Sequence, residues 1–69
     1  MDDHIAMTVQ GPEELVKHMQ KHEVKYWDRF IAERKLYQIF VRDPNGVIIE
    51  LNDYAPDLKN IDPMTIVGT

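Results

Sequence analysis

The turn Asp43-Pro44-Asn45-Gly46 limits the fold of this chain more than any other feature, because an apolar segment lies on each side of it. Asp suits the first position of a turn, Pro presets φ at the next, and Asn-Gly supplies the left-handed positions. A type I turn with a glycine bulge would pair Asp43 with Val47. The turn therefore predicts a tight antiparallel hairpin built from residues 36–42 and 47–52.

This register gives each hairpin strand two different faces. It predicts apolar pairs on one side and polar or aromatic pairs on the other: Val41 with Ile49, Ile39 with Leu51, Phe40 with Glu50, and Gln38 with Asn52. An ionised carboxylate inside an apolar strand is costly unless it is paired or binds a metal. Glu50 is therefore a candidate functional residue.

Three further elements are predicted before the hairpin. Residues 4–9 alternate with period two and indicate a half-buried strand. Gly11-Pro12-Glu13-Glu14 is typical of a helix start, since Pro and acidic residues are favoured in the first turn, and the helix should end near residue 22. Aromatic and β-branched residues favour a strand over residues 24–31. The order is βαβββ, an α+β fold.

Length and composition exclude several classes of protein. The chain has 69 residues, no cysteine and a formal charge of −4. A chain this short forms one domain and buries only about 60% of its unfolded surface. A metal site would have to use His, Asp or Glu. The acidic charge argues against a nucleic-acid partner. No apolar run approaches the roughly 20 residues that span a bilayer, so we expect no membrane partner and a cytoplasmic protein.

The chain divides in character after residue 53. Residues 1–53 are predicted to form one module. Pro56, Pro63 and Gly68 interrupt scattered apolar residues further on, so residues 54–69 are expected to be an irregular tail that is disordered or packs on a partner.

The order of elements, the opening Asp-His-Ile-Ala and the run Gln-Ile-Phe-Val-Arg-Asp-Pro-Asn-Gly-Val-Ile-Ile-Glu-Leu-Asn together resemble a module of the vicinal oxygen chelate superfamily. This superfamily includes glyoxalases, extradiol dioxygenases and bleomycin-resistance proteins. The resemblance covers residues 3–53 and is closest to the C-terminal half of a typical two-module chain. It implies a mixed or antiparallel four-stranded sheet of order 1-4-3-2 with one helix on one face.

In such a module, the face without the helix lines the active site, and His4 lies beside Glu50. The resemblance therefore implies that His4 and Glu50 bind a divalent metal (Fe, Zn, Ni or Mn) and that Glu50 is also catalytic, as a general base. Further side chains are expected to bind the substrate: Thr8, Gln38, Phe40, Arg42, Ile48 and Asn52. The core is expected to contain Ile5, Met7, Val9, Leu15, Met19, Ile39, Val41, Ile49 and Leu51.

Typical members carry two modules per chain, with the metal between them, whereas this chain has one. His4 and Glu50 are too few ligands for a tight site, so we expect a homodimer or a second βαβββ module to complete it. The expected function is that of a metal-dependent lyase, isomerase or dioxygenase that binds its substrate through vicinal oxygens. Two alternatives remain open: a metal-free dimer of the bleomycin-resistance kind that binds an aromatic or cationic ligand, and an inactive half-module. The i, i+4 pair His18 and His22 is a weaker metal candidate.

Overall fold

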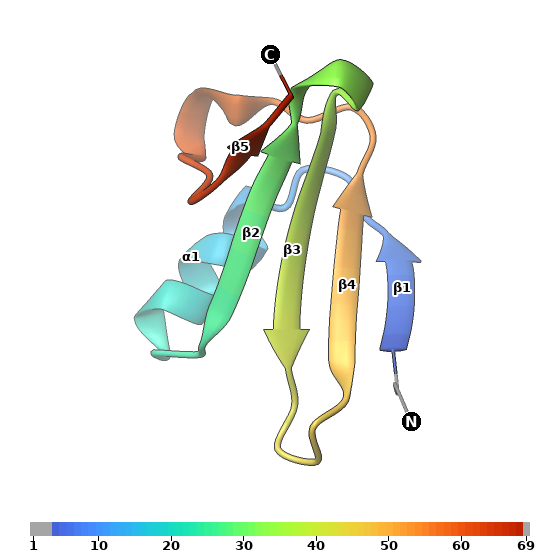
Figure 1. The fold of residues 1–69 in the computed structure, drawn as a ribbon. Coiled ribbons are helices and arrows are strands. Elements are labelled where there is room, and N and C mark those ends of the chain that lie inside the picture. Colours follow the sequence, from blue (N-terminus) through green and yellow to red (C-terminus); the bar gives the residue numbers. More distant parts are fainter. Residues whose placement is uncertain (1–3, 69) are drawn as a thin grey trace.

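The computed structural model describes residues 4–68, which form an α+β fold of one α-helix and a five-stranded mixed sheet (Figure 1). The strands are β1 (His4–Thr8), β2 (Tyr26–Ile31), β3 (Leu36–Arg42), β4 (Ile48–Asp53) and β5 (Ile66–Val67). The helices are α1 (Glu13–Lys21) and two short 3₁₀ helices, η1 (Ala32–Arg34) and η2 (Leu58–Asn60).

The sheet has the order β1-β4-β3-β2-β5. β1 is parallel to β4 and β5 is parallel to β2, while the β2–β3 and β3–β4 pairs are antiparallel. The predicted order 1-4-3-2 is confirmed for the first four strands. The fifth strand was not predicted.

The β3–β4 hairpin has the predicted register. Phe40 pairs with Glu50 and Gln38 with Asn52, as expected from the turn sequence. The Asp43 amide donates to the Val47 carbonyl at 2.9 Å, and the Asp43 carboxylate accepts from the amides of Asn45 and Val47. Gly46 has φ +85°, a left-handed conformation that glycine adopts without steric cost. Local turn chemistry therefore sets the alignment of the two central strands.

The core lies between α1 and the sheet. Val16 and Met19 of α1 pack in one cluster with Tyr37, Ile39 and Leu51. Three predicted core residues are instead exposed: Ile5 (51%), Met7 (47%) and Leu15 (36%). Ile5 and Met7, the two that lie in β1, are exposed because of the position of the helix. α1 lies toward the β2 side of the sheet, whereas β1 forms the opposite edge (Figure 1), so nothing within residues 4–68 covers the apolar face of β1.

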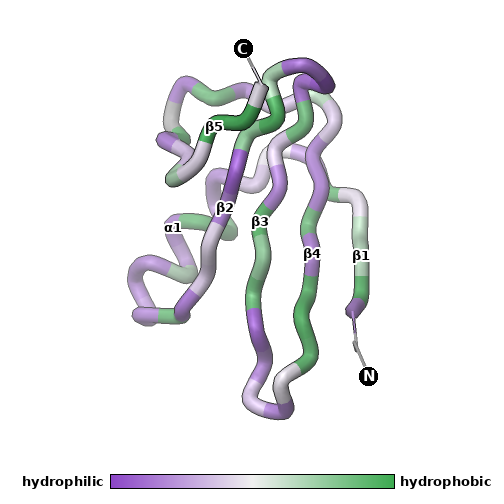
Figure 2. The backbone as a smooth tube through the Cα atoms, in the orientation of Figure 1, coloured by the Kyte–Doolittle hydropathy of each residue, from purple (hydrophilic) through white to green (hydrophobic). Residues whose placement is uncertain are grey.

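The segment after β4 differs from the expected irregular tail because it returns to its own sheet. Ile61 is buried in the core cluster, and β5 pairs with β2, where the Phe30 amide donates to the Thr65 carbonyl at 2.8 Å. The hydropathy pattern in Figure 2 marks β5 as strongly apolar. Residues 54–68 therefore complete the module.

The buried carboxylate of Asp28 attaches this segment to the sheet. One oxygen of Asp28 accepts from the Tyr37 hydroxyl at 2.6 Å, and the other accepts from the Met64 amide at 2.8 Å. Burial of the Tyr37 ring, reinforced by its hydrogen bond to the Asp28 carboxylate, raises the pKa of the Tyr37 hydroxyl well above its usual range. Both oxygens of the Asp28 carboxylate thus have hydrogen-bond donors, and we assign a structural role to this cluster of Asp28, Tyr37 and Met64.

Candidate functional site

The candidate site lies on the sheet face opposite α1, which we call the open face. Residues that pair across neighbouring strands point to the same side of a sheet. The register places the predicted site residues in three adjacent rows: His4, Ile48 and Arg42; Ala6, Glu50 and Phe40; and Thr8, Asn52 and Gln38. The structure thus brings every predicted site residue onto one face of β1, β4 and β3.

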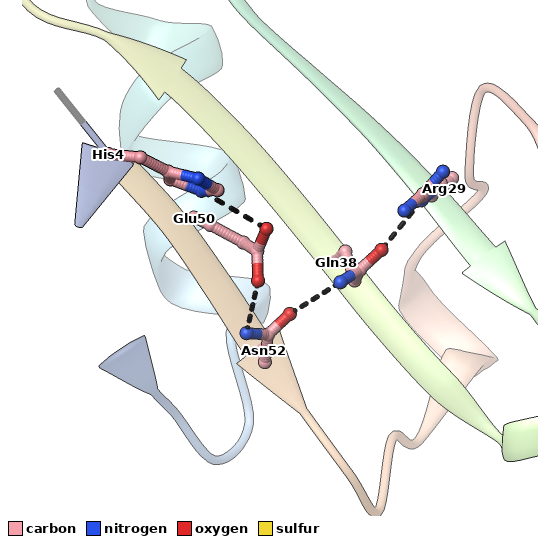
Figure 3. Close-up of polar contacts among 5 residues, drawn as sticks. All are labelled: His4, Arg29, Gln38, Glu50 and Asn52. Atoms are coloured by element: carbon pink, nitrogen blue, oxygen red, sulfur yellow. Dashed lines mark hydrogen bonds and ion pairs between the residues drawn. The ribbon is translucent and has the colours of Figure 1, made fainter. Parts of the chain in front are cut away.

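His4 and Glu50, the two residues predicted to bind a metal, contact each other. The parallel pairing of β1 and β4 sets Ala6 opposite Glu50, and His4 precedes Ala6 by two residues on the same face. His4 Nε2 lies 3.2 Å from Glu50 Oε1 (Figure 3). The His4 side chain is 45% exposed and that of Glu50 only 17%. The carboxylate is therefore partly withdrawn from solvent, while the imidazole remains accessible at the sheet edge.

A chain of side-chain hydrogen bonds runs from Glu50 across the sheet (Figure 3). Asn52 Nδ2 donates to Glu50 Oε2 at 2.7 Å, Gln38 Nε2 donates to Asn52 Oδ1 at 2.9 Å, and Arg29 Nε donates to Gln38 Oε1 at 2.6 Å. Each amide uses its nitrogen toward Glu50 and its oxygen toward Arg29. The chain therefore has one direction, with the carboxylate at one end and the guanidinium at the other.

Two residues of the open face, Arg29 and Trp27 of β2, are not among the predicted site residues. Trp27 pairs with Phe40, and the two rings stack with centroids 5.5 Å apart and planes 10° apart. The Arg29 guanidinium carbon lies 5.5 Å from the Phe40 centroid. Period-two alternation would have placed both residues on this face. The alternation is hard to recognise in the sequence, because Asp28 places a charged residue on the covered side, where an apolar residue is expected.

Other ionisable groups lie apart from this arrangement. His18 of α1 and His22, which directly follows the last residue of α1, have ring centroids 4.4 Å apart and lie on the opposite side of the sheet. Asp53 is 2% exposed and pairs with Tyr37 on the covered face. Its Oδ1 accepts from the Ala55 amide, and its Oδ2 has no hydrogen-bond partner among the described residues. Neither group contributes to the open face.

The spacing of His4 and Glu50 is compatible with two ligands of one metal ion. Ligand atoms about 2.0–2.2 Å from a common ion, at tetrahedral to right angles, lie about 2.8–3.6 Å apart. The observed 3.2 Å falls in this interval, and it also suits a direct hydrogen bond between imidazole and carboxylate. Within residues 4–68, no group of three or more His, Cys, Asp or Glu side chains could hold a metal ion. Among the described residues, His4 and Glu50 are the two potential ligands that neighbour each other on this face.

A helix long and apolar enough to cross a membrane does not occur in the described part of the chain. No protein-family model matches the sequence, and comparisons with curated proteins and with solved structures return no match.

Proposed function

We propose that the open face is half of a divalent-metal site in a module of the vicinal oxygen chelate type, with His4 and Glu50 as its ligands. The observation that supports this most directly is the 3.2 Å contact between His4 Nε2 and Glu50 Oε1 on adjacent parallel strands. A second module, from another copy of this chain or from a partner, completes the site. In a homodimer, two neutral imidazoles and two carboxylates would also offset the charge of a divalent cation.

The neighbouring amides would orient the proposed ligand. Asn52 holds Glu50 Oε2, and Gln38 in turn holds Asn52. Both amide residues are buried, at 6% and 7% exposure, so their rotamers are restricted. Partners of this kind fix the direction of a metal-binding carboxylate. Oε1 of Glu50 is consequently directed toward His4 and the sheet edge.

The chemistry follows from this arrangement in general terms. A divalent ion at the site would act as a Lewis acid toward two vicinal substrate oxygens. Glu50 would accept or return a proton as a general base. The proposed reaction is that of a metal-dependent lyase, isomerase or dioxygenase.

Exposure of the open face supports a second module. Every residue of β1 is exposed, Trp27 is 42% exposed, and Phe40 and Ile48 are only half-buried. Covering this surface would bury apolar area and withdraw Glu50 further from water, which strengthens its electrostatic interactions. Sedimentation of the purified chain at micromolar concentration should therefore detect a dimer. A compact monomer, with or without metal, contradicts the homodimer.

Metal analysis of the purified chain tests the ligands. The parent should bind Zn, Ni, Mn or Fe, and His4→Ala and Glu50→Gln should each abolish stoichiometric binding in calorimetric titration. His18→Ala is the matched control, because it disrupts the other histidine pair, at the C-terminal end of α1, and should leave binding unchanged. Binding that survives both site variants but is lost in His18→Ala assigns the metal to the helix instead.

The stacked rings favour a second candidate function, metal-free binding of a small molecule. Trp27 and Phe40 form a partly exposed aromatic surface beside the polar chain, and aromatic surfaces commonly line ligand sites. A metal-free parent protein that still binds a planar molecule at Trp27 would select this function.

A further inference from the structure

Arg29 is held in position by two contacts that leave part of its guanidinium available. Its Nε donates to Gln38 Oε1, and its Cζ lies above the Phe40 ring. No hydrogen bond or ion pair among residues 4–68 engages its two Nη groups, and the residue is exposed. Arginine presents planar donors that match the two oxygens of a carboxylate. The side chain is therefore positioned to receive an anion.

The surface beside Arg29 is aromatic. Phe40 contacts both the Trp27 ring and the Arg29 guanidinium, and Trp27 remains 42% exposed. A planar ligand gains from contact with such rings as well as from the charge. The aromatic pair and the cation thus present two adjacent recognition elements.

The polar chain separates this cation from the acidic end of the face. Gln38 and Asn52 lie between Arg29 and Glu50, so this hydrogen-bonded chain has a positive end at Arg29 and a negative end at Glu50. An anionic group placed at Arg29 avoids the repulsion that it would meet at Glu50.

We infer that Trp27, Phe40 and Arg29 form a binding site for the carboxylate of a planar aromatic ligand. Arg29 binds the carboxylate through its Nη groups, and the ring system lies against Trp27 and Phe40. A single guanidinium on a chain of formal charge −4 favours a singly charged carboxylate over a more highly charged phosphate. This inference rests on the proposed use of the open face for a small molecule, but it requires no metal.

The test is a titration of metal-free protein, in chelator, with 2-naphthoate, followed by NMR. Trp27 is the only tryptophan, so its indole N–H gives one unambiguous signal, and the Arg29 Nε–H reports on the other end of the site. Both signals should shift together with 2-naphthoate. Acetate, 2-naphthamide and inorganic phosphate at the same concentrations should bind at least several-fold more weakly. Equal affinity for any of these three probes overturns the inference.

Variants separate the guanidinium from general charge effects. Arg29→Gln should weaken 2-naphthoate binding about three- to tenfold, as expected for loss of an exposed charge-assisted hydrogen bond. Arg29→Lys should recover only part of the affinity, because lysine lacks the planar fork. Arg34→Gln, a control on the exposed η1, removes the same charge and should have no effect. Equal losses in Arg29→Gln and Arg34→Gln overturn the inference.

The result is distinguishable from failure of the metal proposal. Naphthoate binding without any metal affinity supports this site and removes the metal function. Metal binding that depends on His4 and Glu50, without naphthoate binding at Trp27, supports the metal site and overturns the present inference.

Discussion

Asp28 and Glu50 are carboxylates on interior strands of the same sheet, yet they occupy opposite faces and have different surroundings. Asp28 is 4% exposed, and its two oxygens accept from the Tyr37 hydroxyl and the Met64 amide. One oxygen of Glu50 accepts from Asn52, while the other faces the half-exposed His4. The covered carboxylate has a hydrogen-bond donor for each of its oxygens and stabilises the fold, whereas the carboxylate of the open face has an oxygen directed toward an accessible edge.

This contrast shows that a charged residue in a strand does not by itself mark a functional site. Both residues have aromatic or apolar neighbours in their strands, and each has a carboxylate that needs partners when withdrawn from water. The difference lies in what covers each face. The returning segment 54–68 supplies a donor to Asp28, whereas Glu50 accepts its hydrogen bond from Asn52 of its own strand.

The largest expected effect is that of Asp28→Ala on stability. It leaves the buried Tyr37 hydroxyl and the Met64 amide without their acceptor, and we expect a loss of about 3 kcal/mol in the free energy of unfolding. Urea unfolding at neutral pH measures it. Asp62→Ala, an exposed acid in the same segment, is the control and should change stability by less than about 0.5 kcal/mol. Similar values for the two variants would show that Asp28 is not a structural anchor.

The dependence of stability on alkaline pH tests the same cluster of Asp28 and Tyr37. Because the pKa of Tyr37 is raised in the folded protein, the unfolded chain loses the proton first, and stability falls as the pH rises above the unfolded pKa of about 10. At a pH of about 11, ionisation of this group in the unfolded chain should lower the free energy of unfolding by on the order of 1 kcal/mol relative to neutral pH.

Urea unfolding of the parent and of Tyr37→Phe between neutral pH and pH 11 measures this difference. Tyr37→Phe should be less stable at neutral pH but should lose less stability at high pH. The other two tyrosines, Tyr26 and Tyr54, are present in both proteins and serve as an internal control. Parallel curves would contradict the proton linkage.

The smallest expected effect on stability is that of Glu50→Gln. Gln retains an oxygen for the Asn52 amide, and a partly exposed pair such as His4 and Glu50 contributes about 0–1 kcal/mol. The free energy of unfolding should therefore change by less than about 1 kcal/mol, although the proposed metal binding should be lost. A loss in the free energy of unfolding as large as that of Asp28→Ala would show that Glu50, like Asp28, has a structural role.

The sequence was most informative where local chemistry decides conformation. Asp43-Pro44-Asn45-Gly46 predicts the turn, the turn sets the register, and the register places Glu50 on the same face as Gln38, Phe40 and Asn52. The order of the first four strands required the resemblance to known modules. His4 and Glu50 are far apart in the chain, and no local pattern relates them.

The tertiary structure alone decided what covers each face. Alternation in β1 predicts that Ile5 and Met7 are apolar contacts, but α1 does not cover that edge of the sheet, so both are exposed. Pro56 and Pro63 indicate irregular backbone, yet Ile61 is buried and β5 pairs with β2. Periodicity determines which side of a strand a residue occupies, because side chains alternate along the backbone. Whether that side is buried depends on contacts between segments distant in sequence. Such contacts are also the reason why Asp28 is covered and Glu50 lies on the open face.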